Sequence, residues 1–279
     1  MRLRRDSSAT NSRRLTGRWH PWPNIIDRVV DEHDVVPRLV FVHGAGLSSA
    51  MWAPQVARFA GALQVTTVDL PGHGSRADER FSLDGARQIV ADELIRDTHR
   101  PVVLIGLSLG GYVAMAVAGR YPQLTAGLVL SGCSIDYSQG RYRLLTRVTR
   151  LAVALWPKPA LNALQTRALR RTYPAYAQTI IDGGLSWAGL RDSVAPLAGT
   201  DWRSVMDTYP HPVLVVTGEN DRRNCAQQDD QVRRLRNGRA RVMAGAGHLC
   251  NLDQPAQFSQ LVYSFAQQLA NDPYRFSAG

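Results

Sequence analysis

The sequence predicts an α/β fold in which a mostly parallel sheet carries helices on both faces. Short apolar runs of strand character alternate with segments of helical periodicity along most of the 279 residues. Such alternation is typical of parallel sheets that are covered on both sides. Glycine-containing motifs directly follow four of the apolar runs, and apolar residues make up 44% of the chain, enough to fill a large core.

The expected elements follow from these runs in order. Apolar runs predict strands at residues 39–42, 64–70, 101–105, 127–131, 213–217 and 239–243. Helical periodicity predicts helices at residues 51–60, 83–97, 109–120, 227–236 and 255–270. Ser82 is well placed to cap the second of these helices. A further apolar run at residues 25–30, which a turn-rich segment separates from the first strand, predicts an opening hairpin.

Residues 133–212 interrupt this alternation. Residues 142–156 and 161–173 show helical patterning, but no strong strand signal occurs before residue 213. We therefore expect one domain over residues 19–279, with a helical insertion at about residues 133–212.

The net charge of +10 is concentrated in two segments. Residues 1–18 hold six arginines and one aspartate, and residues 133–200 hold nine Lys or Arg against three Asp. Residues 1–18 contain almost no apolar side chains, so we expect a disordered basic tail there. A tether to an anionic surface and upstream sequence from an early start codon are both open interpretations of this tail.

No targeting or membrane segment is evident. No apolar segment follows the N-terminal arginines, and a Pro-Lys-Pro sequence at residues 157–159 interrupts the apolar stretch at 151–164. Cys133, Cys225 and Cys250 form no C-x-x-C pair and leave one cysteine over in any disulfide scheme. This favours a reducing compartment and structural roles for the three thiols. We expect a soluble, cytoplasmic protein.

The most specific motif is Gly-Leu-Ser-Leu-Gly at residues 106–110, which follows an apolar run and opens a helical segment of small residues. A serine on a tight strand-to-helix turn needs flanking glycines because side chains there would collide, and the turn presents the hydroxyl at a helix N-terminus. A hydroxyl is a weak nucleophile near neutral pH, so it requires a nearby base. Ser108 is therefore a candidate nucleophile, with an ordinary turn serine as the alternative.

Two further motifs, which hold residue types that this chemistry needs, follow other strands. Asp221 ends the sequence Thr-Gly-Glu-Asn-Asp after one strand, and His248 follows the next. Because imidazole titrates near neutral pH, His248 is the candidate base, and Asp221 would orient it and stabilise its charged form. The alternatives are a loop histidine for His248 and a helix N-cap for Asp221. Asp136, after the strand that ends at residue 131, is a competing acid.

With these motifs in this order, residues 38–269 resemble the serine α/β-hydrolases. The resemblance implies the α/β-hydrolase fold, a doubly wound and mostly parallel sheet, with the insertion at 133–212 acting as a helical lid. It also implies a catalytic triad of Ser108, Asp221 and His248.

The resemblance extends to two loops beside this triad. His-Gly-Ala-Gly at residues 43–46 lies where such enzymes carry their oxyanion loop, which implies that the backbone N–H groups of Ala45 and Leu109 form the oxyanion hole. Residues 69–75 are similar to a turn that this superfamily often carries. We expect structural roles for His43 and His73 rather than catalytic ones.

Several relatives within this superfamily fit less well. Dehalogenases and epoxide hydrolases of this fold use Asp at the position of Ser108, which excludes them. Carbon–carbon hydrolases usually show Asn where Leu107 stands, and cofactor-free peroxidase-like members show an aromatic residue where Ala45 stands. The motifs look most similar to those of esterases and enol-lactone hydrolases.

The insertion combines arginines with aromatic residues. One hypothesis is that aromatic side chains, Trp156 and Trp187 among them, line an apolar acyl pocket while an arginine meets a carboxylate or phosphate of the substrate. The alternative is a solvated basic face whose aromatic residues pack the insertion onto the body.

These observations predict a serine hydrolase that cleaves a carboxylic ester or lactone of a small, partly apolar substrate through an acyl-enzyme. The chemistry requires no metal or organic cofactor, and no ligand cluster for a metal is visible in the sequence. No nucleic-acid partner and no integral membrane segment are expected. Two alternatives remain: a carbon–carbon bond hydrolase of a diketone-type metabolite, and a non-catalytic ligand receptor on a hydrolase scaffold.

Overall fold

Six parallel strands form the centre of the structure. The computed structural model describes residues 37–97, 99–137 and 140–271, all within one unit, Glu32–Gly279. The strands occur in the order β2-β1-β3-β4-β5-β6, and every neighbouring pair is parallel. Their bounds are β1 Arg38–Val42, β2 Val65–Val68, β3 Val102–Leu107, β4 Gly127–Ser131, β5 Val213–Gly218 and β6 Gly238–Met243.

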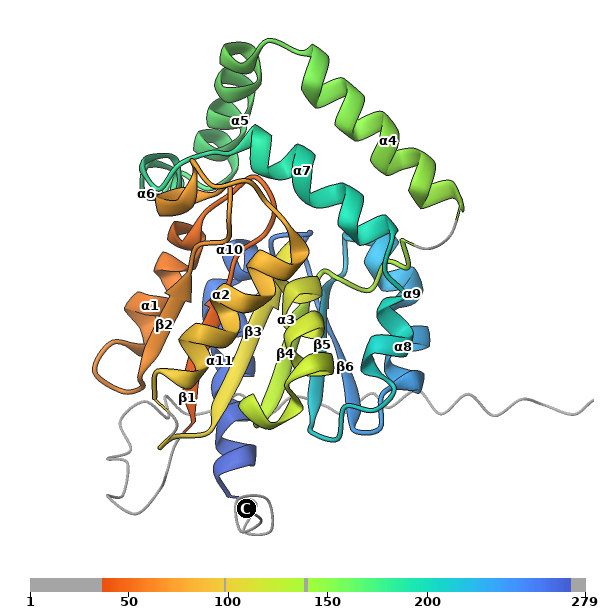
Figure 1. The fold of residues 1–279 in the computed structure, drawn as a ribbon. Helices are drawn as coiled ribbons and strands as arrows, with labels where there is room; N and C mark the ends of the chain where they lie inside the picture. Colours follow the sequence, from red (N-terminus) through yellow and green to blue (C-terminus); the bar gives the residue numbers. More distant parts are fainter. Residues whose placement is uncertain (1–36, 98, 138–139, 272–279) are drawn as a thin grey trace, which may run out of the picture. The chain divides into compact units, whose positions relative to one another are not determined.

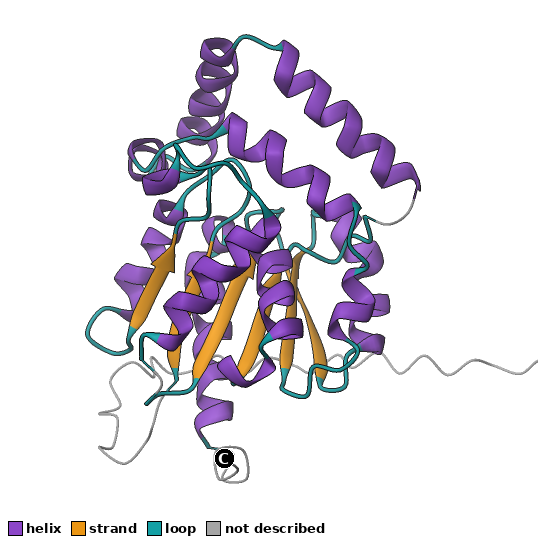
Figure 2. Ribbon diagram, viewed as in Figure 1, coloured by secondary structure: helices purple, strands orange, loops and turns teal. Residues whose placement is uncertain are grey.

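Helices cover both faces of this sheet (Figures 1 and 2). One face carries α2 (Leu83–Ile95), α3 (Leu109–Arg120), α8 (Trp202–Met206) and α9 (Arg222–Arg234). The other carries α1 (Ala53–Phe59), α10 (Cys250–Asp253) and α11 (Pro255–Ala270). Alternate residues of β1 serve the two cores, because Val40 and Val42 face the first and Leu39 and Phe41 the second. The predicted α/β class with helices on both faces is confirmed.

Most predicted elements lie within a few residues of the observed ones. Ser82 caps α2 by accepting a hydrogen bond from the N–H of Gly85 at 3.1 Å. The predicted opening hairpin is wrong, because both edges of β1 are occupied by the parallel strands β2 and β3. Its proposed first strand, residues 25–30, and the basic tail, residues 1–18, lie outside the described residues. Short 3₁₀ turns occur at Ser49–Trp52, Gly74–Arg76 and Pro122–Leu124.

In its described part, the chain between β4 and β5 contains helices and no strand. It contains α4 (Gly140–Leu155), α5 (Lys158–Thr172), α6 (Ala177–Asp182) and α7 (Trp187–Ala198) before α8. In Figure 1 this segment rises above the ends of the strands, with α4 and α5 farthest from the sheet. Among the described residues, no helix is both long enough and apolar enough to cross a bilayer.

A buried arginine joins the start of β1 to the end of α2. Arg38 exposes 2% of its surface and donates to the Glu93 carboxylate at 3.1 Å and to the backbone carbonyls of Glu93 and Leu94 at 2.9 and 3.1 Å. The same Glu93 pairs with Arg96 at 3.0 Å, but the Arg96 side chain is 73% exposed. A buried charge whose partner is removed costs far more than an exposed one.

We expect Arg38→Leu to lower the free energy of unfolding by about 2–4 kcal/mol, because two helix-end carbonyls lose their donor and the half-buried Glu93 carboxylate keeps only the exposed Arg96. Urea denaturation measures this loss. Arg96→Leu is the matched control, since it removes the exposed partner of the same glutamate and is expected to cost less than about 1 kcal/mol. Equal losses in the two variants would contradict the distinction.

Candidate active site

The turn between β3 and α3 holds Ser108 in a strained backbone conformation. Ser108 has φ 53° and ψ −115°, and it is the only described residue other than glycine with a positive φ. The neighbouring glycines are required by close approach: a Cβ at Gly106 would collide with the backbone of Gly110, and one at Gly110 with the carbonyls of Val42 and His43. Backbone strain of this kind persists only where the surrounding structure enforces it, and it concentrates at functional sites.

The loop after β1 lies directly against this turn. A Cβ placed on Gly44 would be 3.6 Å from the Cβ of Ser108. The N–H groups of Gly44 and Gly46 are engaged, by the Met51 sulfur at 3.4 Å and by His73 Nε2 at 3.1 Å. In contrast, the N–H groups of Ala45 and Leu109 have no acceptor within the described part of the chain. Two free backbone donors therefore belong to the two segments that meet beside Ser108.

His43 and His73 hold this loop in place. Their rings lie 4.9 Å apart between centroids. His43 Nε2 accepts from the N–H of Leu70 at 3.0 Å while its Nδ1 contacts the carbonyl of Gly44 at 2.9 Å. His73 makes the equivalent contacts to the N–H of Gly46 and the carbonyl of Pro71. Each ring must be neutral to accept at Nε2 and donate at Nδ1. The structural roles predicted for both histidines are confirmed.

Burial keeps these rings uncharged. Burial, together with the neighbouring His73, lowers the pKa of His43 from 6.5 to about 4, against the opposing effects of the Gly44 hydrogen bond and Asp69. Burial likewise lowers the pKa of His73. Asp69 stabilises the adjoining turn by accepting from the N–H groups of Ser49 and Ser75 at 2.7 and 2.9 Å. The predicted turn-shaping role of residues 69–75 is confirmed.

Asp221 and His248 are in direct contact. The Nδ1 of His248 lies 2.6 Å from Oδ2 of Asp221. Asn224 donates to the same oxygen through its Nδ2 at 2.8 Å, and its backbone N–H reaches Oδ1 at 3.4 Å. Burial alone would raise the pKa of the Asp221 carboxyl, but the hydrogen bond and charge of His248 and the bonds from Asn224 lower it below its usual value. Asp221 thus caps α9 and partners His248 at once.

His248 and Ser108 border the same turn after β4. The N–H of Ser108 donates to the carbonyl of Ser131 at 2.8 Å. The next residue, Gly132, has φ 57°, which favours glycine, and a Cβ there would lie 3.1 Å from the His248 ring, closer than an ordinary contact. The His248 side chain is 46% exposed, whereas that of Asp221 is 11% exposed. The base candidate therefore faces solvent while its acid partner is sheltered.

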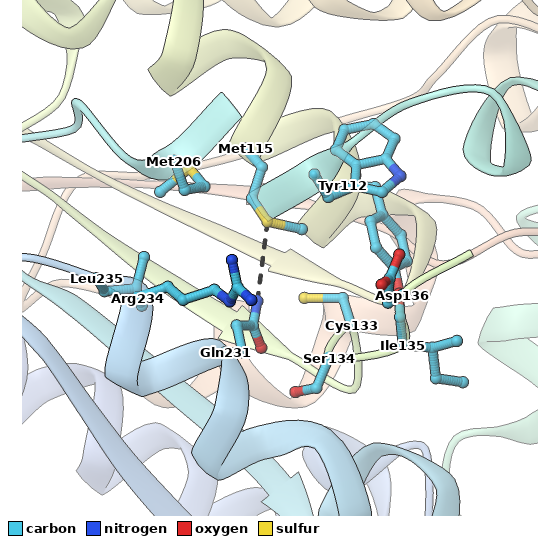
Figure 3. Close-up of a pocket in the computed structure, with 11 residues that line it drawn as sticks. Tyr112, Met115, Cys133, Ser134, Ile135, Asp136, Met206, Gln231, Arg234 and Leu235 are labelled. Atoms are coloured by element: carbon cyan, nitrogen blue, oxygen red, sulfur yellow. Dashed lines mark hydrogen bonds between the residues drawn. The ribbon is translucent and has the colours of Figure 1, made fainter. Parts of the chain in front are cut away.

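The competing acid, Asp136, lies in a different setting. It lines a small cavity of about 20 Å³ on the α3 side of the sheet, together with Tyr112 and Cys133 (Figure 3). Its backbone N–H donates to Gln227 at 3.0 Å. The His248 contact is instead made by Asp221. Neither this cavity nor a larger one of about 550 Å³, which α4, α7 and the loop before α2 line, includes the three candidate catalytic residues.

Sequence reasoning missed two residues that shape the site. Asn224 connects Asp221 to the body, because its Oδ1 also accepts from the N–H of Ser134 at 2.7 Å. Its position one helical turn after Asp221 is the signal that could have identified it. Gly132 had no comparable local signal, because its role depends on an imidazole more than one hundred residues away.

The two tryptophans named from the sequence occupy unlike places. Trp187 is half-buried at the start of α7, and its Nε1 is buried without an acceptor among the described residues. Its neighbour Ser186 donates its N–H to the carbonyl of Gly46 at 3.0 Å, so this end of α7 packs on the loop after β1. Trp156, between α4 and α5, is 59% exposed. Substrate contact by either tryptophan stays a prediction.

The cysteines and possible metal ligands add no second reactive centre within the described residues. Cys133 and Cys250 are buried and Cys225 is half-buried, and all three are free thiols. Burial raises the pKa of Cys250 to about 12 and raises that of Cys133 further. In the part of the chain that the structure describes, no group of three His, Cys, Asp or Glu side chains could hold a metal ion.

Comparisons with known proteins agree with this architecture. The sequence model of the alpha/beta hydrolase family matches residues 39–261, and the chain belongs to that family. Pimeloyl-[acyl-carrier protein] methyl ester esterase from Neisseria meningitidis is 27% identical over 255 residues, covering 86% of this chain and 80% of the relative. The enzyme of that name from Aromatoleum aromaticum is 30% identical over 211 residues, covering 66% and 80%.

A solved structure supports the same fold. The esterase from Thermogutta terrifontis superposes with a TM-score of 0.70 at 22% identity, over 84% of this chain and 90% of that chain. The resemblance to α/β-hydrolases that the motifs predict is confirmed, as is the fold class. Whether residues 133–212 act as a lid stays a prediction.

Acidification is expected to destabilise the fold through His43. Its folded pKa lies below its ordinary value, so the unfolded chain takes up a proton as the pH falls through about 6.5 while the folded protein does so only near 4. Stability is therefore lost across that window, by on the order of 3 kcal/mol from this residue. Urea denaturation at several pH values measures the loss.

His43→Gln removes this titration while keeping an amide that can donate and accept. We expect the variant to be less stable at pH 7 and to lose stability less steeply between pH 7 and pH 4.5. His99→Gln, at an exposed histidine, is the control and should follow the wild-type curve. A His43→Gln curve parallel to wild type would refute the assignment.

Proposed function

We propose that the protein is a serine hydrolase that cleaves a carboxylic ester or lactone of a small, partly apolar substrate through an acyl-enzyme. The observation that carries the proposal is the strained turn at Ser108. This turn is hydrogen-bonded to Ser131, and the next residue, Gly132, lies close to the ring of His248. Backbone strain at a serine that has glycines two residues away on each side, where close packing excludes side chains, is typical of functional sites.

In the proposed reaction, Ser108 Oγ attacks the substrate carbonyl while Nε2 of His248 accepts its proton. The contact between Nδ1 of His248 and Asp221 fixes the tautomer that leaves Nε2 free, and the carboxylate stabilises the imidazolium that forms. The histidine then protonates the leaving alcohol. Water, activated by the same base, attacks the acyl-enzyme and releases the acid.

The negative charge on the carbonyl oxygen needs donors that are already in position. The N–H groups of Ala45 and Leu109 support this role, because they have no other acceptor among the described residues and belong to segments that adjoin Ser108. Leu109 is also the first residue of α3, where the helix dipole favours negative charge. Donors held in advance by backbone packing supply a large share of catalysis in acyl transfer.

Ester hydrolysis is supported by the relatives, whose names describe methyl ester esterases. The exposed His248 supports a site that opens to solvent, as deacylation by water requires. The helices between β4 and β5 contribute Trp187 next to the loop after β1, and we propose that this segment acts as the lid and selects the substrate. The site chemistry requires no cofactor.

Ser108→Ala is expected to abolish the burst of p-nitrophenol that wild type releases from p-nitrophenyl esters, because no acyl-enzyme can form. Turnover should fall by at least about 10³-fold. Stopped-flow absorbance with acyl chains of increasing length measures the burst and sizes the acyl pocket. A burst that persists in Ser108→Ala would refute the nucleophile.

Other outcomes of this experiment would favour a different function. Turnover of a vinylogous diketone without turnover of any ester would indicate carbon–carbon hydrolysis. Binding of ligands without turnover of either substrate class would indicate a receptor on a hydrolase scaffold.

Asp221→Asn is expected to lower kcat by roughly 10³–10⁴-fold, because an amide can present a donor to Nδ1 and so favour the wrong tautomer of His248. The fold should persist, since Asn also caps helices well. Glu219→Gln is the matched control, because Glu219 lies two residues earlier and its carboxylate, among the described residues, accepts from the N–H of Gly245 at 2.9 Å and does not contact His248. It should change kcat by less than about threefold, and comparable losses in both variants would argue against a specific role for Asp221.

A further inference from the structure

Helix α4 packs on the rest of the molecule through its more polar side. It contacts α7, beside which it lies in Figure 1. Among the side chains of α4 with described burial, those on the inner side are Tyr142, Thr146, Thr149 and Val153, of which Thr146 is buried and the others are half-buried. Their spacing of four, three and four residues places them along one side of the helix. Tyr142 also accepts a hydrogen bond from Gln227 at 2.9 Å.

The outward side of α4 is apolar. Leu144, Val148, Leu151 and Leu155 repeat with the same spacing, two residues out of step with the inner row and hence on roughly the opposite side of the helix. Their exposed fractions are 62%, 55%, 60% and 75%. We call these four residues the outer stripe. A helix on the surface of a water-soluble domain ordinarily has the reverse arrangement.

The chain segment around the outer stripe extends the apolar surface and carries basic but no acidic side chains. Trp156 and Leu164 follow it in the chain with exposed fractions of 59% and 66%. No Asp or Glu occurs between Asp136 and Asp182. The Lys and Arg side chains of this segment with described burial are all exposed: Arg147, Arg150, Lys158, Arg167, Arg170 and Arg171.

We propose that the outer stripe docks on the surface of an anionic lipid bilayer. Its apolar side chains would enter the boundary between headgroups and acyl chains, and the flanking arginines would pair with lipid phosphates. An amphipathic helix with basic residues beside an apolar row, and an aromatic residue at its end, is the pattern that lies in a membrane interface. The proposal concerns attachment and does not depend on whether Ser108 reacts.

Charge argues against a second copy of this chain as the occupant, and the exposed apolar row argues against an acidic protein. In a symmetric pair of chains joined through the outer stripe, the same cationic segment of each copy would face its counterpart, and like charges at an interface oppose association. An acidic protein would satisfy the arginines, but ion pairing gives no reason for a continuous row of Leu and Val exposed over more than half of their surface. A bilayer satisfies both features.

Co-sedimentation with vesicles tests the proposal directly. The full-length protein is mixed with vesicles of phosphatidylcholine containing 30% phosphatidylglycerol, or of phosphatidylcholine alone, at physiological salt. We expect binding to the anionic vesicles at least tenfold stronger than to the neutral ones. Leu151→Ser/Leu155→Ser should weaken binding to anionic vesicles at least tenfold, and Arg147→Gln/Arg150→Gln should weaken it severalfold.

Matched variants separate the outer stripe from general surface properties. Ile95→Ser/Val242→Ser removes two side chains that are 54% and 56% exposed elsewhere, and Arg58→Gln/Arg100→Gln removes two exposed arginines outside the segment. Neither control should change binding appreciably. Circular dichroism and thermal melts confirm that every variant folds. Quenching of tryptophan fluorescence by brominated lipids should decrease in Trp156→Phe, because Trp156 is expected at the interface.

Two results would overturn the proposal. One is wild-type protein that stays in the supernatant with anionic vesicles. Sedimentation velocity would then decide between the other occupants: concentration-dependent dimers would assign the outer stripe to a second copy, and a monomer would leave an acidic protein. The other is vesicle binding that the Leu151→Ser/Leu155→Ser change leaves intact, which would place the attachment on basic residues outside the stripe.

Discussion

The close approach of α3 to the end of β1 is the constraint on which the site depends. At Gly110 the first turn of α3 comes so near the carbonyls of Val42 and His43 that no side chain fits between them. This contact sets the position of Ser108 on one side and of the loop carrying Ala45 on the other. The geometry is therefore fixed by packed backbone, which varies less than side-chain positions do.

The two buried histidines extend this constraint into the second loop. They are compact groups that can accept from one backbone N–H and donate to one carbonyl at the same time. His43 and His73 use this property to join the loop after β1 to the turn at residues 69–75. A pair of aliphatic side chains would fill the same space but would leave two N–H groups buried without partners, at a cost of about 1–3 kcal/mol each.

Local sequence signals predicted the parts of the structure that depend on neighbours in the chain. The alternation of strands and helices, the cap at Ser82 and the turn at Ser108 all follow from residues within a few positions of one another. The hairpin failed because strand order depends on pairing with β3, about sixty residues away, which no local pattern encodes. Gly132 was missed for the same reason, since its role depends on the distant His248 ring, whereas Asn224 did have a local signal in its position one helical turn after Asp221.

The inside-out polarity of α4 shows a limit of another kind. Periodicity correctly predicts a helix but does not tell which side faces the body, because a helix with one apolar row looks alike in either orientation. The orientation follows instead from burial, since Thr146 is buried and Tyr142 and Thr149 are half-buried. If the insertion were interpreted as an ordinary packed layer, its apolar row would be placed against the protein body, whereas Leu144, Leu151 and Leu155 are exposed.

Both ends of the segment between β4 and β5 are fastened to the body by hydrogen bonds. At its start the N–H of Ser134 donates to Asn224, the residue that also holds Asp221, and near its end the hydroxyls of Tyr209 and Thr125 lie 2.8 Å apart. The outer helices α4 and α5, which lie between these anchors and farthest from the sheet, can therefore change in length and sequence without displacing the contact between Asp221 and His248. The molecule is thus divided into a part that evolution must preserve and a part it is free to exchange, so reactivity and selectivity can diverge separately in descendants of this chain.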